Sequence, residues 1–238
     1  MDKGKIALVT GAGRGIGRAV ALAFAGEGLA LALVARTEGE LRETALLARE
    51  RGAPEAVPIP ADVTRPGEVR RVVEEAGRRW GRLDVLVNNA GIAPVATLEE
   101  TDPGTWERVL AVNLTGPYLV LREALPLLEA ARGAHVFQMI SAAGRRPFPG
   151  FAAYCASKHG LLGFTAVVRD ELRARRIKVT AVLPGAVDTG IWDSVPGRFD
   201  RSRMLRPDDV AHAVLSAWKE SGTSFTEEIA LGPVGGAL

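Results

Sequence analysis

Hydrophobic and polar positions follow one another in blocks along the chain. The residues 5–10 are mostly apolar and partly β-branched, and they end at a glycine cluster, after which apolar residues recur at helical spacing from Ile16 to Phe24. A short apolar run is typical of a buried strand, and spacing of three or four residues is typical of a helix that buries one face. The chain is therefore predicted to open with a strand followed by a helix.

The same alternation continues towards the C-terminus. Further strands are predicted at 29–35, 56–60, 84–88, 135–140, 178–183 and 225–231, and helices at 38–51, 66–79, 105–132, 151–175 and 207–220. Strands and helices that alternate at these lengths predict a parallel sheet covered on both faces, joined by right-handed crossovers. The predicted fold class is α/β: a doubly wound parallel sheet of seven strands, the Rossmann fold, whose ligands bind at the carboxyl ends of the strands.

The length of 238 residues is compatible with one α/β domain. Neither an internal repeat nor a linker interrupts the chain, so we expect a single domain over 1–238. The stretch 188–206 has no clear periodicity, and a loop at about 186–206 is the expected substrate loop.

Composition and charge exclude several classes of protein. Hydrophobic residues make up 47% and charged residues 24%, as in globular domains, and a net charge of +2 argues against a nucleic-acid surface. The longest uncharged run, 85–98, has 14 residues, whereas a transmembrane helix needs about 20. We therefore expect a small-molecule substrate, with no nucleic-acid partner and no membrane partner.

The cysteine and histidine content limits the location and the metal chemistry. The chain has one cysteine, Cys155, and three histidines that are far apart, and no signal peptide is recognised at its start. No intramolecular disulfide can form, no zinc pattern is present, and a cytoplasmic location is expected.

A glycine-rich segment lies between the first predicted strand and helix. It is Thr10–Gly17, T-G-A-G-R-G-I-G. Glycines allow the backbone to approach a pyrophosphate, and the N-terminus of the following helix attracts the negative charge. A tight turn would use the same residues, but the α/β pattern around it favours nucleotide binding.

With this segment the chain resembles the short-chain dehydrogenase/reductase family, whose shorter members carry T-G-x-x-x-G-x-G at the same place. Further motifs follow in the family's order, over nearly the first 190 residues: Asp62-Val63, Asn88-Asn89-Ala90-Gly91, Asn113, Ser141, Tyr154-x-x-x-Lys158 and Pro184-Gly185. The resemblance implies an NAD(P)-dependent oxidoreductase that acts on a carbonyl or alcohol group.

Tyr154 and Lys158 lie four residues apart at the start of a predicted helix, so both project from one face. We expect the lysine ammonium to stabilise the tyrosine phenolate and to lower the tyrosine pKa. The resemblance implies that Tyr154 exchanges a proton with the substrate oxygen, which Ser141 holds, and that Lys158 binds the nicotinamide ribose. It also implies that Asn113 holds a water linked to Lys158; a helix-bending asparagine with satisfied hydrogen bonds is the alternative.

The resemblance implies further contacts with the cofactor. Asp62 and Val63 contact the adenine, Asn88 to Gly91 line the adenosine side, and the segment after residue 183 lies beside the nicotinamide. The full set of expected cofactor contacts is Gly11, Arg14, Gly15, Ile16, Gly17, Arg36, Asp62, Val63, Asn89, Ala90, Gly91, Tyr154, Lys158, Pro184, Gly185, Val187 and Thr189.

The choice between NAD(H) and NADP(H) depends on the end of the second predicted strand. An acidic residue there binds the ribose 2′-hydroxyl, whereas an arginine accepts a 2′-phosphate. Here Ala35 and Arg36 occupy this place, and Arg14 lies within the glycine segment. NADP(H) is therefore favoured, and the nearby Glu38 leaves NAD(H) open.

The predicted function is a carbonyl reductase or alcohol dehydrogenase. Residues expected to border the substrate are Arg145, Arg146, Phe148, Phe151, Trp192 and Phe199, from which no substrate charge is assigned. Two alternatives stay open: a 3-oxoacyl thioester reductase of fatty-acid synthesis, and a nucleotide-sensing protein without turnover. The resemblance also implies a homotetramer or homodimer built on the helices 105–132 and 151–175, and we expect 229–238 to pack against a neighbouring subunit.

Overall fold

Seven parallel strands form a single sheet in the described part of the chain, in the order β3-β2-β1-β4-β5-β6-β7. The computed structural model describes residues 4–194, 200–220 and 224–235. The strands are β1 (Ile6–Thr10), β2 (Ala30–Ala35), β3 (Ala56–Pro60), β4 (Val85–Asn88), β5 (His135–Met139), β6 (Lys178–Pro184) and β7 (Glu228–Leu231). The doubly wound α/β fold predicted from the sequence is confirmed.

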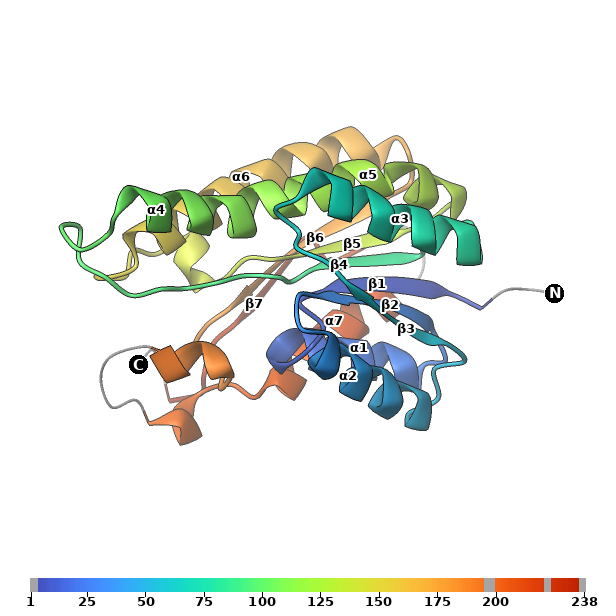
Figure 1. Ribbon diagram of the computed structural model, residues 1–238, viewed down its shortest axis with the longest axis horizontal. Coiled ribbons are helices and arrows are strands. Elements are labelled where there is room, and N and C mark those ends of the chain that lie inside the picture. Colours follow the sequence, from blue (N-terminus) through green and yellow to red (C-terminus); the bar gives the residue numbers. More distant parts are fainter. Residues whose placement is uncertain (1–3, 195–199, 221–223, 236–238) are drawn as a thin grey trace.

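Helices cover both faces of this sheet (Figure 1). One layer contains α1 (Gly15–Gly26), α2 (Glu38–Glu50) and α7 (Pro207–Lys219); the other contains α3 (Pro66–Trp80), α4 (Pro103–Leu110), α5 (Gly116–Ala130) and α6 (Ala152–Arg173). Successive strand residues face opposite layers, so Ala7 and Val9 belong to one hydrophobic core and Ile6 and Leu8 to the other. Burial on both faces explains why the strands are continuous apolar runs.

β1 marks the point at which the strand order reverses. It pairs with β2 on one side and with β4 on the other, both in parallel. Since the connections after β1 and β4 leave towards different layers, a crevice opens at their carboxyl ends, where ligands of doubly wound sheets bind. The glycine-rich segment follows β1 at this edge.

The long helix predicted at 105–132 is interrupted, and this is the main difference from the expected elements. A π-helical turn, Ala111–Thr115, separates α4 from α5, and the N–H of Gly116 donates to the carbonyl of Ala111. Pro117 has no N–H, so the carbonyl of Asn113 lacks its α-helical partner. The periodicity of the apolar positions did not reveal this interruption because it continues through the turn.

The segment 188–206 contains two short 3₁₀ turns in its described part, Gly190–Ser194 and Arg201–Arg203. Residues 195–199 of the expected substrate loop lie outside the described residues, as does Phe199. Within the described ranges, every helix is too short or too polar to cross a bilayer.

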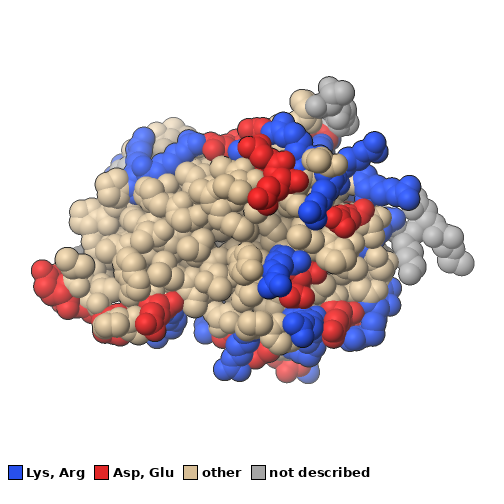
Figure 2. Space-filling model, turned by 90° about the horizontal axis from the view of Figure 1, so that it is seen from above, with Lys and Arg blue, Asp and Glu red and all other residues tan. Residues whose placement is uncertain are grey.

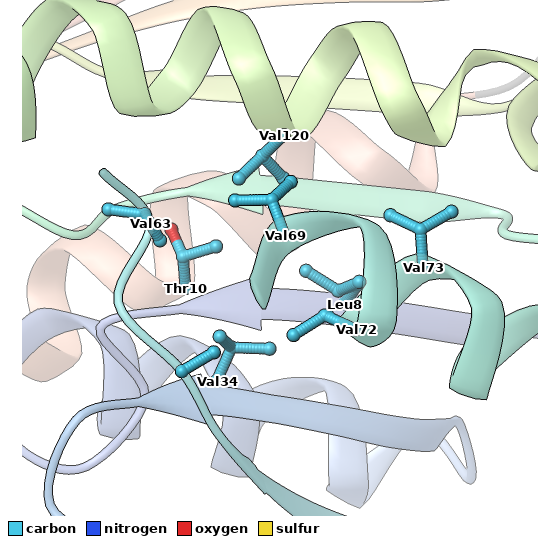
Figure 3. A pocket seen from close by; sticks show the side chains of 9 residues that line it. Leu8, Thr10, Val34, Val63, Val69, Val72, Val73 and Val120 are labelled. Carbon is cyan, nitrogen blue, oxygen red and sulfur yellow. The ribbon is translucent and has the colours of Figure 1, made fainter. Parts of the chain in front are cut away.

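A small void lies between the sheet and α3. Its volume is about 10 Å³, and Figure 3 shows that valines and Leu8 surround it. The hydroxyl of Thr10 is the polar group at its edge, and this group already donates to the carbonyl of Val87 and accepts from the N–H groups of Asn89 and Ala90. A void this small with an apolar lining is a packing defect of the core and not a ligand site.

His135 is a buried titratable group on β5, remote from the carboxyl ends of the strands. Its ring stacks on Phe137 with 4.0 Å between ring centres, and its Nε2 lies 2.7 Å from Oγ1 of Thr180. The Thr180 hydroxyl donates to the carbonyl of Thr226, so it accepts from the imidazole N–H. Burial, with a smaller effect of the Lys178 charge, lowers the pKa of His135 to about 3.

Acid should therefore destabilise the fold through His135. As the pH falls below the ordinary histidine pKa of about 6.5, the unfolded chain binds a proton that the folded chain does not, and stability falls by about 1.4 kcal/mol per pH unit until the folded-state pKa is reached. His135→Gln removes this titration and retains an amide donor. In urea unfolding between pH 6 and pH 4, we expect the free energy of unfolding of the wild type to fall, relative to the variant, by about 1.4 kcal/mol for each pH unit. A stability difference independent of pH would contradict the assignment.

Candidate active site

The glycine segment approaches its neighbours so closely that side chains are excluded. A Cβ on Gly17 would lie 2.2 Å from the carbonyl oxygen of Gly11, and one on Gly11 would lie 2.7 Å from Nδ2 of Asn89. Gly11 also has a φ of +65°, which favours glycine. The Asn89 amide donates to the carbonyls of Thr10 and Gly11, so it holds the ends of β1 and β4 together.

The N-terminus of α1 suits an anionic ligand. It has no side-chain cap and no acidic residue in its first turn. Its first N–H groups therefore lack partners within the helix, and the helix dipole adds positive potential. Together with the side-chain-free surface of Gly11 and Gly17, these donors fit a dinucleotide pyrophosphate.

The two arginines expected to choose the cofactor lie after β1 and β2, at the carboxyl ends of these strands. Arg36 follows β2 and is exposed, and Arg14 is largely exposed with its guanidinium 4.0 Å from Glu40. Glu38, the acidic residue that left NAD(H) open, forms an ion pair of 2.6 Å with Arg42.

An open pocket of about 280 Å³ lies beside Arg36 at the ends of β2 and β3. Its lining residues are Arg36, Pro60, Ala61, Asp62, Arg65 and Glu68. Burial acts to raise the pKa of Asp62, but hydrogen bonds from Thr64 and the charges of Arg36 and Arg65 prevail and hold that pKa below its usual value. Sequence reasoning missed Arg65 and Glu68, because only the packing of α3 beside β2 places them near Arg36.

Val63, the other residue expected near the adenine, is buried and packs against the π-helical turn. A Cβ on Gly116 would lie 2.9 Å from Cγ2 of Val63. Val63 thus connects the loop after β3 with the start of α5, beside the π-helical turn that contains Asn113.

Ser141, Tyr154 and Lys158 come together at the end of β5. Ser141 follows the strand, and Tyr154 and Lys158 occupy successive turns at the start of α6. Lys158 is only 4% exposed, and its Nζ donates to the carbonyl of Met139 at 2.9 Å. The same nitrogen lies 5.6 Å from the centre of the Tyr154 ring, and the side chain of Ser141 is near enough to Tyr154 to affect its pKa.

The expected lowering of the Tyr154 pKa is wrong for this structure. Burial raises the pKa of Tyr154, the Ser141 side chain offsets part of this effect, and the neighbouring Cys155 adds to it. Burial also lowers the pKa of Lys158 to about 8. Desolvation disfavours both the phenolate and the ammonium, and the lysine is hydrogen-bonded to the backbone, so it does not reverse the effect on the tyrosine.

Asn113 is fully buried within the π-helical turn. Its Oδ1 accepts from the N–H of Ile92, and its Nδ2 donates to the carbonyl of Ile92 and to the hydroxyl of Ser157. The Ser157 hydroxyl donates in turn to the carbonyl of Tyr154. The asparagine side chain therefore ties the loop after β4 to α6.

The loop after β4 leaves space beside these groups. A Cβ on Gly91 would lie 3.4 Å from Oδ1 of Asn113 and 3.7 Å from Nζ of Lys158. Ala90 packs at the edge of the α3 and α5 core, and Asn89 faces the glycine segment. Residues 89–91 therefore lie between the glycine segment on one hand and Asn113 and Lys158 on the other.

The segment after β6 also contacts the glycine segment. Gly185 donates to the carbonyl of Leu231, and Val187 is buried and bridges to Leu205. Cγ2 of Thr189 would lie 3.2 Å from a Cβ on Gly15. Thr189 therefore lies against the start of α1.

The residues expected around the substrate are in part engaged elsewhere. Arg145 forms an ion pair with Glu228 of β7, and the Trp192 indole donates to the carbonyl of Val187 at 2.9 Å. The ring of Phe151 lies 6.0 Å from that of Tyr154, and Phe148 is exposed. In the described ranges, no three His, Cys, Asp or Glu side chains gather in a way that could hold a metal ion.

Comparison with known proteins identifies the family of this chain. A family model described as short chain dehydrogenase matches residues 5–197. This chain belongs to the short-chain dehydrogenase family. It is an NAD(P)-dependent dehydrogenase/reductase, and its seven-stranded parallel sheet is the fold of its solved relatives.

Relatives of this short-chain dehydrogenase extend over nearly the whole chain. Sepiapterin reductase from Chlorobaculum tepidum is 33% identical, with 98% of both chains covered. The 3-oxoacyl-[acyl-carrier-protein] reductase FabG from Thermotoga maritima is also 33% identical, with 95% of both covered. An alcohol dehydrogenase from Thermococcus sibiricus, solved with 5-hydroxy-NADP, is 32% identical, with 97% of both covered and a TM-score of 0.89.

Ser141 has a backbone conformation that is unfavourable for any residue other than glycine. Its φ is +153° and its ψ is 162°, a region that essentially only glycine populates. Ser141→Gly and Ser141→Ala both remove the hydroxyl that accepts from the N–H of Ala143, but only glycine relieves the strain. We expect the glycine variant to be more stable than the alanine variant by about 1 to 2 kcal/mol in urea unfolding. Equal stability would show that Ser141 is not strained.

Proposed function

We propose that this enzyme transfers hydride between NADP(H) and a carbonyl or alcohol substrate, with Tyr154 as the proton donor and acceptor. One observation carries the proposal: Ser141, Tyr154 and Lys158 lie together at the end of β5, with Nζ of Lys158 5.6 Å from the centre of the Tyr154 ring, at the same sheet edge as the glycine segment. Proton exchange, oxygen binding and dinucleotide binding are thereby gathered at one place.

The residues around Tyr154 divide the proton chemistry among them. When bound, the nicotinamide supplies or accepts the hydride. The raised pKa keeps Tyr154 protonated at neutral pH, so its hydroxyl can give its proton to the oxygen of a carbonyl that is being reduced. Ser141 donates to the same oxygen, and Lys158, with a pKa of about 8, lies close enough to stabilise the phenolate that remains.

The backbone carbonyl of Asn113 completes this proposed arrangement. We infer that it binds a water that carries protons between Lys158 and solvent, since the π-helical turn removes its helical partner and Gly91 leaves room beside Lys158. The side chain of Asn113 positions the loop and α6.

Removal of the Tyr154 hydroxyl tests the proton role. With Tyr154→Phe we expect turnover to fall by about 100- to 10 000-fold, because the ring still packs but cannot exchange a proton. NADPH oxidation should be followed by absorbance over a panel of ketones, aldehydes and 3-oxoacyl thioesters, with NADPH affinity measured on the same samples as a control. Unchanged turnover would exclude Tyr154 as the proton donor, and cofactor binding without turnover on the whole panel would favour the nucleotide-sensing alternative.

The preference for NADP(H) rests on charges at the adenosine end. Arg36 and Arg14 lie there, no acidic residue stands at position 35, and Glu38 is held by Arg42. The Thermococcus sibiricus relative was solved with 5-hydroxy-NADP. A guanidinium binds a phosphate through two parallel hydrogen bonds, and an aspartate would repel it.

Exchange of the charge at position 36 should invert the preference. With Arg36→Asp we expect the affinity for NADPH to fall by about 10- to 100-fold, while that for NADH stays equal or rises. Fluorescence titration with both cofactors measures this, and Arg70→Gln, an exposed change on α3, controls for loss of a positive charge. An equal loss for both cofactors would contradict a 2′-phosphate contact.

A 3-oxoacyl thioester reductase is the second candidate. The similarity to the Thermotoga maritima reductase over 95% of both chains favours it, and the proposed catalytic residues serve either reaction. The substrate panel separates the two, because a thioester reductase would turn over the 3-oxoacyl thioester fastest.

We propose a homotetramer or homodimer assembled on α5 and α6. Figure 2 shows a broad uncharged surface over the helices α4, α5 and α6, with charged residues gathered towards the other end. Exposed apolar residues of this face include Tyr118 and Val167, and a second copy of the chain would remove them from water. We further propose a cytoplasmic enzyme, since a single free cysteine fits a reducing compartment.

A further inference from the structure

One backbone carbonyl of the glycine segment is held by a charged side chain. The carbonyl oxygen of Gly13 accepts from Nε of Arg18 at 2.9 Å and from Nη2 of the same side chain at 2.6 Å. Arg18 lies in the first turns of α1, directly behind the segment that would receive the phosphates. It is not among the residues expected to touch the cofactor.

The other neighbour of this carbonyl cannot replace Arg18. Oγ1 of Thr44 lies 3.3 Å from the Gly13 oxygen but 3.0 Å from the carbonyl of Glu40, and it has one proton to donate. It also accepts from Nε of Arg18 at 3.1 Å. The orientation of the Gly13 carbonyl therefore depends mainly on the guanidinium.

This orientation matters for an anionic ligand. A carbonyl oxygen carries partial negative charge and would repel a pyrophosphate if it turned into the crevice. In a trans peptide the C=O of Gly13 and the N–H of Arg14 point in opposite directions, so a carbonyl held towards Arg18 directs that N–H away from it. Gly13 gives this peptide freedom to rotate on its N-terminal side, because glycine has access to a wide range of backbone conformations.

We propose that Arg18 is a positioning residue for the cofactor diphosphate. It holds the Gly13 peptide so that the N–H groups at the start of α1, and not a carbonyl, face the phosphates. The side chain is 24% exposed and also pairs with Glu43 at 2.7 Å, so its hydrogen bonds to Gly13 are partly shielded from water. The proposal rests on dinucleotide binding by the family and is independent of the choice between NAD(H) and NADP(H).

Binding of three ligands distinguishes an effect on the diphosphate from an effect on the 2′-phosphate or on the whole binding site. NADPH contains the diphosphate and the 2′-phosphate, ADP contains only the diphosphate, and adenosine 2′-monophosphate contains only the 2′-phosphate. Calorimetric titrations of wild type and Arg18→Met should show affinities for NADPH and ADP weakened by about 10-fold or more, with the affinity for adenosine 2′-monophosphate within two-fold. Turnover at saturating NADPH should also stay within about two-fold, since Arg18 does not touch the reacting groups.

Two further variants, Glu43→Gln and Arg18→Lys, test the same role. Glu43→Gln removes the ion pair but leaves the bonds to Gly13, so it should bind all three ligands as the wild type does. Arg18→Lys keeps the charge but loses the two-nitrogen fork, so it should lose ADP affinity even if Arg18→Met does not fold. Unchanged ADP affinity in both Arg18 variants, or an equal loss for all three ligands, would overturn the proposal. Failure of the wild type to bind ADP or NADPH would instead refute dinucleotide binding itself.

Discussion

Parallel pairing of the strands is the constraint on which the site depends. Because all seven strands run in the same direction, their carboxyl ends meet at one edge, and residues separated by more than a hundred positions become neighbours there. Asn89, after β4, donates to the backbone at the end of β1. Thr189, after β6, also lies against the glycine segment. The tightest approach, at Gly11 and Gly17, leaves no room for a side chain, so backbone N–H groups form the surface that meets a phosphate.

Burial has opposite effects in different parts of this fold. In the cores it stabilises the sheet, but at Tyr154 and Lys158 it disfavours the charged form of each group. Burial thus keeps Tyr154 protonated at neutral pH and makes it a weaker acid than free tyrosine, so release of its proton depends on the groups that stabilise the phenolate. The strained backbone of Ser141 and the π-helical turn at Asn113 belong to the same region, which indicates that local stability has been given up where the proposed chemistry takes place.

Much of this architecture was predictable because it depends on local pattern. Apolar runs marked the strands, and their alternation with helices was sufficient for the doubly wound sheet. The long predicted helix was wrong at one place, since the apolar spacing continues through a π-helical turn that Gly116 and Pro117 impose. The chain position of Ser141 was predictable, whereas its positive φ was not, because it depends on how the strand end meets α6.

By itself the sequence determined the order of strands and helices, the glycine segment and the identities of the residues at the strand ends. Only the tertiary structure decided how those residues act on one another. It showed that Arg65 and Glu68 share a pocket with Arg36, that Arg18 holds the Gly13 carbonyl, and that burial raises the pKa of Tyr154. The physical reason is that strand and helix patterns are local, whereas hydrogen bonds, desolvation and charge interactions depend on distances between segments that are far apart in the chain.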